Sequence, residues 1–95
     1  MRSGPILEFE WDEAKHARNR WERGIGSDDG ARTFDGPVLV WEDKRREYGE
    51  DRFRAVGESA GDILHGAFTR RRGVMRIISV RRANRKETEL WRPGK

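Results

Sequence analysis

The sequence predicts an α+β fold in which an antiparallel sheet of four to five strands has two N-terminal helices on one face and is followed by a short C-terminal helix. Two observations support this class. Apolar residues recur at helical spacing in the first third of the chain, whereas the remainder holds four β-branched or aromatic runs separated by polar turns. Because 95 residues supply one modest hydrophobic core, residues 1–95 are expected to form a single domain with the order β-α-α-β-β-β-β-α.

The chain is expected to begin with a strand and a helix. Residues 6–9 form a short apolar run of strand character. Asp12 is a suitable N-cap for a helix over residues 12–23, and Gly24 is placed to end that helix in a left-handed conformation. Three apolar residues fall on one side of this helix, and we expect that side to be the packed one; they are Ala14, Ala17 and Trp21.

A second, shorter helix is expected to follow. Ser27 is a candidate cap, and the helix carries Ala31 and Phe34. Gly30 lies in its middle and weakens it by about 1 kcal/mol relative to alanine.

The pattern changes to strands from Val38 onward. The four expected strands are VLVW (38–41), RFRAVG (52–57), DILHGAFT (62–69) and VMRIISVRR (74–82). The short loops between them favour an antiparallel meander. A last helix is expected to begin at Asn84, because Glu87 follows three residues later at the spacing of a capping box.

Charge is distributed unevenly along the chain. The net charge is +4, but residues 1–62 hold 11 Lys and Arg against 15 Asp and Glu, while residues 63–95 hold 10 against 2. The stretch between Asp62 and Glu87 contains no acidic residue, and this pattern favours binding to a polyanion over a merely solvated surface. Its eight cations are Arg70, Arg71, Arg72, Arg76, Arg81, Arg82, Arg85 and Lys86.

Composition also excludes several kinds of site. The chain has no cysteine, so a disulfide framework, a thiolate metal site and a cysteine nucleophile are all excluded. Its two histidines are too few for a zinc site, and we expect neither a metal nor a cofactor. No apolar stretch approaches the ~18 residues of a membrane span, so we expect a cytoplasmic protein without a membrane partner.

The last expected strand, residues 74–82, joins apolar and basic residues. Strict alternation would place Arg76 and Val80 on one face and Ile77 and Arg81 on the other. Neither face is purely apolar, so we expect the end of the strand to emerge from the core. The basic turn before it and the basic segment after it lie about 25 to 30 Å apart, and an extended RNA strand could touch both.

If this surface is catalytic, the metal-free reaction open to it is RNA cleavage by the 2′-hydroxyl. Glu87 is the candidate base and His65 a candidate acid, while Arg76 and Arg81 would stabilise the phosphate. The remaining cations are candidates for RNA binding; they are Arg70, Arg71, Arg72, Arg82, Arg85 and Lys86.

Simpler interpretations exist for each of these residues. Helix capping alone explains Glu87. His65 alternates with Ile63 and Ala67, which favours a core histidine over a proton donor. The four tryptophans are interpreted as core or interface anchors. The basic segment is equally compatible with a protein that binds RNA or the ribosome without cleaving anything.

Beyond these patterns, a set of motifs runs in order along nearly the whole chain. They are FEWDEAK (9–15), Asn19, RGI (23–25), Ala31, FDGP (34–37), GEDRF (49–53), FTRRRGVMRIISVRRANRKE (68–87) and Trp91. The most specific are the FEWD start and the RIIS-x-R-R-A-x-R-x-E end. Together these motifs resemble the BrnT toxins of bacterial type II toxin-antitoxin systems.

The resemblance implies a RelE-like fold and a ribonuclease activity that arrests translation and growth. It also implies neutralisation by a BrnA antitoxin with a ribbon-helix-helix part, through which the pair would bind operator DNA and repress its own operon. The family's active surface falls on Arg76, Arg81, Arg82 and Glu87. The segment SDDGA (27–31) departs from the family pattern because it lacks an aromatic residue and adds Gly30.

Overall fold

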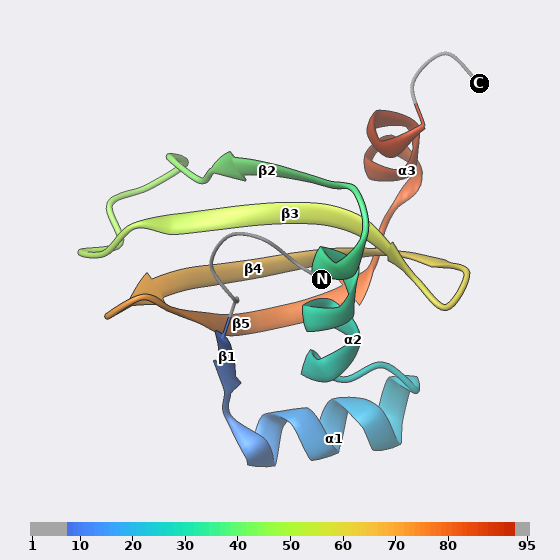
Figure 1. The fold of residues 1–95 in the computed structure, drawn as a ribbon, viewed down its shortest axis with the longest axis horizontal. Coiled ribbons are helices and arrows are strands. Elements are labelled where there is room, and N and C mark those ends of the chain that lie inside the picture. The colour runs from blue at the N-terminus through green and yellow to red at the C-terminus, as the bar shows by residue number, and fades with distance from the viewer. Residues whose placement is uncertain (1–7, 93–95) are drawn as a thin grey trace, which may run out of the picture.

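The computed structural model describes residues 8–92, and the elements follow the predicted order (Figure 1). A 3-10 turn extends the second helix. The expected strand over residues 6–9 is found two residues later, and residues 6 and 7 lie outside the described part. The elements are β1 (Glu8–Trp11), α1 (Glu13–Arg23), α2 (Ser27–Arg32), η1 (Thr33–Asp35), β2 (Val38–Glu42), β3 (Arg52–Ser59), β4 (Asp62–Arg71), β5 (Val74–Arg82) and α3 (Arg85–Trp91).

The strands form one five-stranded sheet in the order β1-β5-β4-β3-β2. Strands β2 to β5 make the expected antiparallel meander, but β1 pairs with β5 in parallel. The prediction of a fully antiparallel sheet is therefore wrong, and the sheet is mixed. The reason is connectivity: short loops force only the last four strands to be antiparallel, whereas two helices separate β1 from its successor.

Two tight turns position the long central strands. Ala60 and Gly61 link β3 to β4 with φ of 50° and 87°, and Arg72 and Gly73 link β4 to β5 with φ of 53° and 82°. Two consecutive positive φ values are typical of the type I′ turn, whose twist matches that of paired strands. Arg72 therefore occupies a turn position that is costly for a residue with a Cβ atom.

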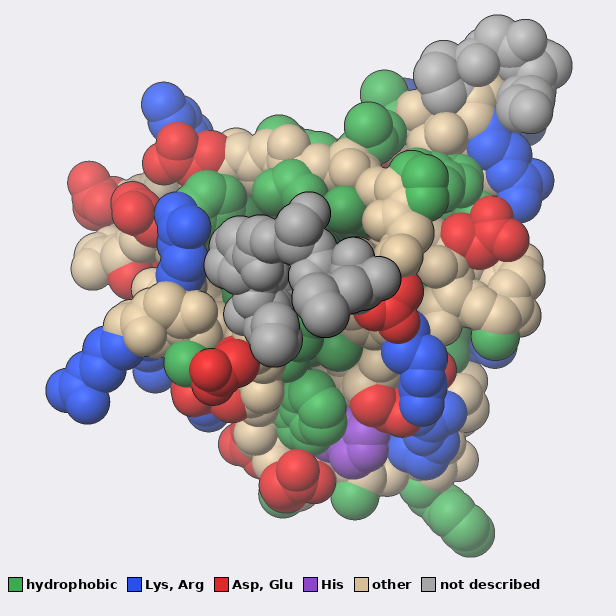
Figure 2. Space-filling model, viewed as in Figure 1, with side chains coloured by type: hydrophobic (Ala, Val, Ile, Leu, Met, Phe, Trp, Pro, Cys, Tyr) green, Lys and Arg blue, Asp and Glu red, His purple; other side chains and the backbone are tan. Residues whose placement is uncertain are grey.

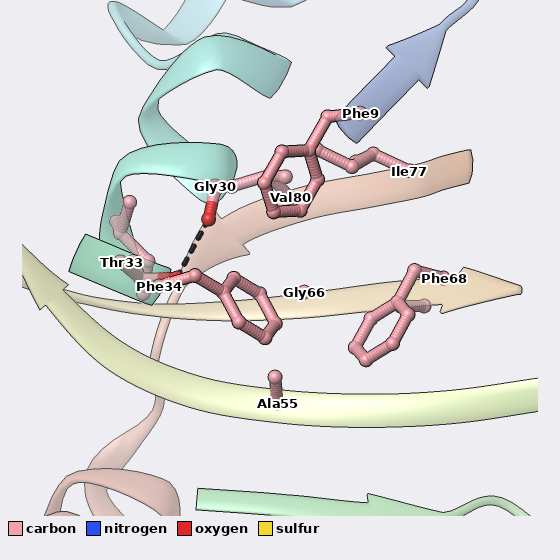
Figure 3. A pocket seen from close by; sticks show the side chains of 11 residues that line it. Phe9, Gly30, Thr33, Phe34, Ala55, Gly66, Phe68, Ile77 and Val80 are labelled. Carbon is pink, nitrogen blue, oxygen red and sulfur yellow. Dashed lines mark hydrogen bonds between the residues drawn. The ribbon is translucent and has the colours of Figure 1, made fainter. Parts of the chain in front are cut away.

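The hydrophobic core lies between α2 and the sheet (Figure 3). Its buried cluster consists of Ile25, Leu64, Ile77 and Val80. Gly30 faces this layer, and a Cβ atom there would lie 2.6 Å from Val80 Cγ2. The glycine that weakens α2 is thus the residue that lets the helix approach the sheet.

The N-terminus of α2 differs from the prediction. Gly26, not Ser27, is the N-cap, and the Asp29 carboxylate accepts a hydrogen bond of 3.0 Å from the Gly26 N–H. A carboxylate three residues into the helix thereby supplies the cap interaction that glycine has no side chain to make.

Helix α1 has the predicted caps but the opposite orientation. Asp12 accepts from the Lys15 N–H, and Gly24 ends the helix with φ of 72°. However, Trp21 is 89% exposed, and no residue of the helix is buried. The polar side attaches α1 instead: Arg20 pairs with two aspartates near the start of α2, and His16 Nδ1 accepts from a backbone N–H there. The prediction that the apolar side is packed is wrong.

A bulge in β5 overturns the predicted alternation. Ala67 lies opposite Ser79 but Phe68 lies opposite Ile77, so Ile78 is an extra residue in β5. Consequently Ile77 and Val80 both point into the core.

The same bulge places the two arginines that alternation had separated on one face. Arg76 lies opposite Thr69, and Arg81 opposite His65. Since these β4 partners are four residues apart on a regular strand, Arg76 and Arg81 share the face of the sheet away from α2, hereafter the open face.

Candidate active site

The open face presents side chains in regular rows. One row places His65 between Val56 and Arg81, and the next includes Trp41 and Arg54. Helix α3 contacts β3 and β4 and covers one end of this face. Sequence and register therefore bring polar groups from three strands beneath one helix.

The start of α3 fixes Glu87 above this surface. The Asn84 side chain accepts from the Glu87 N–H, and the Glu87 carboxylate accepts from the Asn84 N–H, both at 2.9 Å. The predicted capping box is thus confirmed. Glu87 is only 6% exposed, so its carboxylate depends on protein groups for hydrogen bonds.

Two arginines meet this carboxylate. Arg81 donates to both oxygens of Glu87 at 2.7 and 2.8 Å, in a bidentate pair. Arg54 Nη2 donates to Oε2 at 3.3 Å. The hydrogen bonds from Arg81 lower the pKa of Glu87 to about 2, and the hydrogen bond from the Asn84 N–H adds to this effect. Glu87 is therefore a carboxylate at neutral pH, and its pairing raises the pKa of Arg81.

His65 completes the group, hereafter the Glu87 cluster (Arg54, His65, Arg81 and Glu87). Its Nε2 accepts from Arg54 Nε at 2.9 Å and lies 3.8 Å from Glu87 Oε2. Burial, reinforced by nearby Arg81, lowers the pKa of His65 to about 4. At neutral pH the imidazole is uncharged with its proton on Nδ1, which is buried and has no hydrogen-bond partner among residues 8–92.

Sequence reasoning missed Arg54. Within RFRAVG, Phe53 and Ala55 flank Arg54, so alternation already puts this arginine on the face opposite the one they share. Alternation does not show how far this side chain is buried: it is 20% exposed and reaches Glu87 from 33 residues away.

Arg76 does not join the Glu87 cluster. It lies two rows from Arg81, about 13 Å along the strand at 3.3 Å per residue. Its Nη1 pairs with Glu10 Oε2 of β1 at 2.7 Å. Of the four predicted catalytic residues, the fold brings together Arg81, Glu87 and His65.

The predicted RNA-binding arginines near the β4–β5 turn are dispersed. Arg71 pairs with Glu50 at 3.1 Å, and Arg70 lies over the Phe53 ring at 5.7 Å. Arg72 is exposed at the turn. Figure 2 shows acidic and basic side chains interspersed on the left of the molecule, where this turn and the loop over residues 43–51 lie.

The other three candidates lie near the opposite end of β5. Arg82 donates to the Arg23 carbonyl oxygen and lies 3.9 Å from Asp62. Arg85 pairs weakly with Glu89 one turn along α3, and Lys86 is exposed. Of these cations, Arg82 has an acidic neighbour from a distant part of the sequence, Asp62, and Arg85 has one from its own helix, Glu89.

Two kinds of feature are absent from residues 8–92. Their helices are all too short or too polar to cross a membrane. No three side chains of the His, Cys, Asp or Glu type gather there in an arrangement that could hold a metal ion.

Comparison with known protein families gives a match, whereas comparison with curated proteins does not. Residues 11–87 match the family described as "Ribonuclease toxin, BrnT, of type II toxin-antitoxin system", and this span includes all four members of the Glu87 cluster. The match covers most of the chain and agrees with the resemblance in its motifs. The chain therefore belongs to the BrnT family of ribonuclease toxins of type II toxin-antitoxin systems.

Proposed function

We propose that residues 1–95 form a single RelE-like toxin domain that cleaves RNA at the Glu87 cluster and so inhibits translation and growth in the cytoplasm. The observation that carries this proposal is the bidentate pair between Arg81 and Glu87, which lies beside Arg54 on the open face. It supplies fixed positive charge and a carboxylate in the same place, in a chain whose family consists of ribonuclease toxins.

The proposed reaction needs no metal. The 2′-oxygen attacks the adjacent phosphorus, its proton passes to Glu87, and the bond from phosphorus to O5′ breaks. The products are a 2′,3′-cyclic phosphate and a 5′-hydroxyl, whose proton comes from water. Arg81 and Arg54 stabilise the extra negative charge on the pentacoordinate phosphate.

Substrate binding would itself strengthen the base. In the free protein the pKa of Glu87 is about 2, chiefly because of Arg81, so this carboxylate is a weak base. A bound phosphate that accepts hydrogen bonds from Arg81 or Arg54 weakens the contacts of these arginines with Glu87, and the contacts with Arg81 are the chief cause of the lowered pKa. The pKa of Glu87 then rises toward its ordinary value when the reaction requires a base.

The remaining residues have supporting roles in the proposal. His65 holds Arg54 through the Nε2 contact, because a buried neutral imidazole with a pKa near 4 is a poor acid at neutral pH. Arg76 binds a more distant phosphate. Further contacts to an extended strand come from the other cations, Arg70, Arg71, Arg72, Arg82, Arg85 and Lys86.

We also propose that the protein partner is a BrnA-like antitoxin with a ribbon-helix-helix domain. The family's type II classification supports a protein antitoxin. Operator DNA would be contacted only through that antitoxin. Co-expression with the adjacent small reading frame tests this: a stable complex that binds operator DNA is expected, whereas the toxin alone should not bind it specifically.

Cleavage of a single-stranded RNA in EDTA tests the catalytic proposal. The wild-type protein should release fragments with cyclic phosphate and 5′-hydroxyl ends, and a 2′-deoxy substitution at the cleaved linkage should stop the reaction. Arg81→Ala and Glu87→Gln should each reduce the rate by at least ~100-fold. The matched control is Glu50→Gln, because the Glu50 carboxylate also pairs with two arginines but is more exposed than that of Glu87.

Circular dichroism of each variant verifies that it is folded at the assay temperature. Cleavage by folded Arg81→Ala and Glu87→Gln at the wild-type rate would refute the assignment of the site. RNA binding by the wild-type protein without any cleavage would instead show a binding protein of the same fold.

A further inference from the structure

We infer that Trp41 is a stacking platform for an RNA base next to the phosphate held by the Glu87 cluster. This inference rests on the proposed function, because it names the part of the substrate that the site recognises beyond its phosphate. It replaces the interpretation of Trp41 as a simple core anchor.

The position of Trp41 supports this role. It lies on β2 directly opposite Arg54 of β3, on the open face. The Arg54 guanidinium carbon lies over the indole at 5.3 Å from the ring centroid, and the His65 ring meets it edge-on at 6.4 Å. Trp41 is therefore in contact with two members of the Glu87 cluster, on the side of the cluster away from Arg81.

The surroundings of the indole leave room for a ligand. Strand β2 is the last strand of the sheet, so within residues 8–92 no strand flanks Trp41 on the side away from Arg54. The residue is only partly buried. These are the properties of an aromatic ring that a flat partner can cover.

An RNA base is the partner whose chemistry fits. A phosphate bound by Arg54 and Arg81 brings a sugar and a base with it, and the nearest aromatic surface on the side of β2 is Trp41. Bases splayed out of a single strand stack on aromatic side chains, whereas a base paired within a duplex is not free to do so. Trp41 would thus restrict cleavage to single-stranded RNA.

The competing explanation is that Trp41 only positions Arg54 through the cation–π contact. The two explanations differ in what they require of the ligand. A stacking platform needs a base, whereas a residue that acts through Arg54 affects every anion bound by that guanidinium, including inorganic polyphosphate.

The experiment combines protein and RNA changes. The probe is a single-stranded RNA oligonucleotide made uncleavable by a 2′-deoxy nucleotide at the mapped cleavage site, and a series of such strands carries one abasic nucleotide at each position. Binding to wild-type protein, Trp41→Leu and Trp41→Phe is measured by fluorescence anisotropy. Trp21→Leu, which removes a fully exposed indole from α1, is the matched control.

Stacking predicts that one abasic position weakens wild-type binding by ~10-fold or more. Trp41→Leu should weaken binding of the intact strand by a similar factor and remove the effect of that abasic position. The affinity of Trp41→Phe for the intact strand should lie between those of the wild type and Trp41→Leu. The affinity of Trp21→Leu should match that of the wild type. Polyphosphate binding should be unchanged by Trp41→Leu.

Two results would overturn the inference while leaving the proposed function intact. The first is that Trp41→Leu binds the abasic strand with a loss of affinity equal to the product of the two separate losses. The base and Trp41 would then act independently. The second is an equal loss of RNA and polyphosphate binding in Trp41→Leu, which would show a positioning residue. Failure of the wild-type protein to bind or cleave any RNA would instead contradict the proposed function itself.

Discussion

The two ends of the β4–β5 hairpin present arginines in opposite settings. At the α3 end, Arg81 and Arg54 share one carboxylate, Glu87, which is almost fully buried. At the turn end, Arg71 and Arg52 also share one carboxylate, Glu50, but the side chains there are more open to solvent. In both places two arginines share one carboxylate, and the two places differ in how deeply the side chains are buried.

Burial decides which arginines can do more than attract RNA. An exposed ion pair is screened and easily rearranged, so it contributes affinity and little geometry. A bidentate pair with a buried carboxylate holds each N–H group in a fixed direction, and preorganised donors are what a transition state requires. The sequence shows the same residue type at both ends, and only the fold separates their roles.

The largest expected effect concerns geometry at constant charge. Arg81→Lys keeps the cation but cannot form the bidentate contact, so the RNA cleavage rate should fall by at least ~100-fold. The matched change Arg71→Lys at the turn end should leave the rate within about threefold. Rates are measured under single-turnover conditions. Equal effects of Arg81→Lys and Arg71→Lys would show that arginines at the two ends of the hairpin do not differ in their role in cleavage.

The next effect concerns stability. Glu87→Gln leaves two arginines without a buried counterion and should reduce the free energy of unfolding by about 3 kcal/mol in urea titrations. Glu50→Gln should leave the unfolding midpoint unchanged, because solvent replaces the lost contact. A small effect of Glu87→Gln would mean that water reaches the Glu87 cluster freely.

Local signals predicted the elements that border this cluster. Residues 74–82 were predicted as a strand with the observed bounds, and the Asn84 and Glu87 capping box was predicted from spacing alone. Both depend on short-range chemistry, namely β-branched residues and a cap. Arg81 and Glu87, two of the four members of the Glu87 cluster, are therefore placed by local signals.

The other half depends on contacts between distant segments. The bulge at Ile78 exists only because β5 pairs with β4, and it puts Arg76 and Arg81 on one face. Arg54 reaches Glu87 across 33 residues. The orientation of α1 is set by Arg20 and its aspartate partners, not by the helix's own apolar side. No local pattern encodes such pairings.

A smaller effect concerns pH. Because the pKa of His65 is lowered to about 4, the unfolded chain binds a proton near pH 6.5 before the folded protein does. Stability is therefore fully present above pH 6.5 and declines as the pH falls toward 4, by at most about 1.4 kcal/mol per pH unit. His65→Gln, whose side-chain oxygen can still accept from Arg54, should remove this slope in urea titrations at several pH values.

Glu87 provides a second window at lower pH. Its pKa is lowered to about 2, so its stabilising contribution is complete above about pH 4.5 and is lost between there and pH 2. In His65→Gln this lower window should persist. A pH slope between 6.5 and 4.5 that survives in His65→Gln would mean that another group titrates there.

The smallest effect is expected at the turn end. Arg72 has a positive φ of 53°, which asparagine tolerates better, so Arg72→Asn should fold at least as well as the wild type. It removes one cation from a solvated position, and RNA affinity at low salt should fall only a few-fold. The slope of log affinity against log salt should decrease by about 0.7, the value for one phosphate contact on a single strand. The cleavage rate of bound RNA should stay unchanged, since Arg72 would act on encounter and not on the reacting phosphate. A fall in that rate comparable to the fall in Arg81→Lys would place the turn inside the catalytic site and erase the contrast between the two ends.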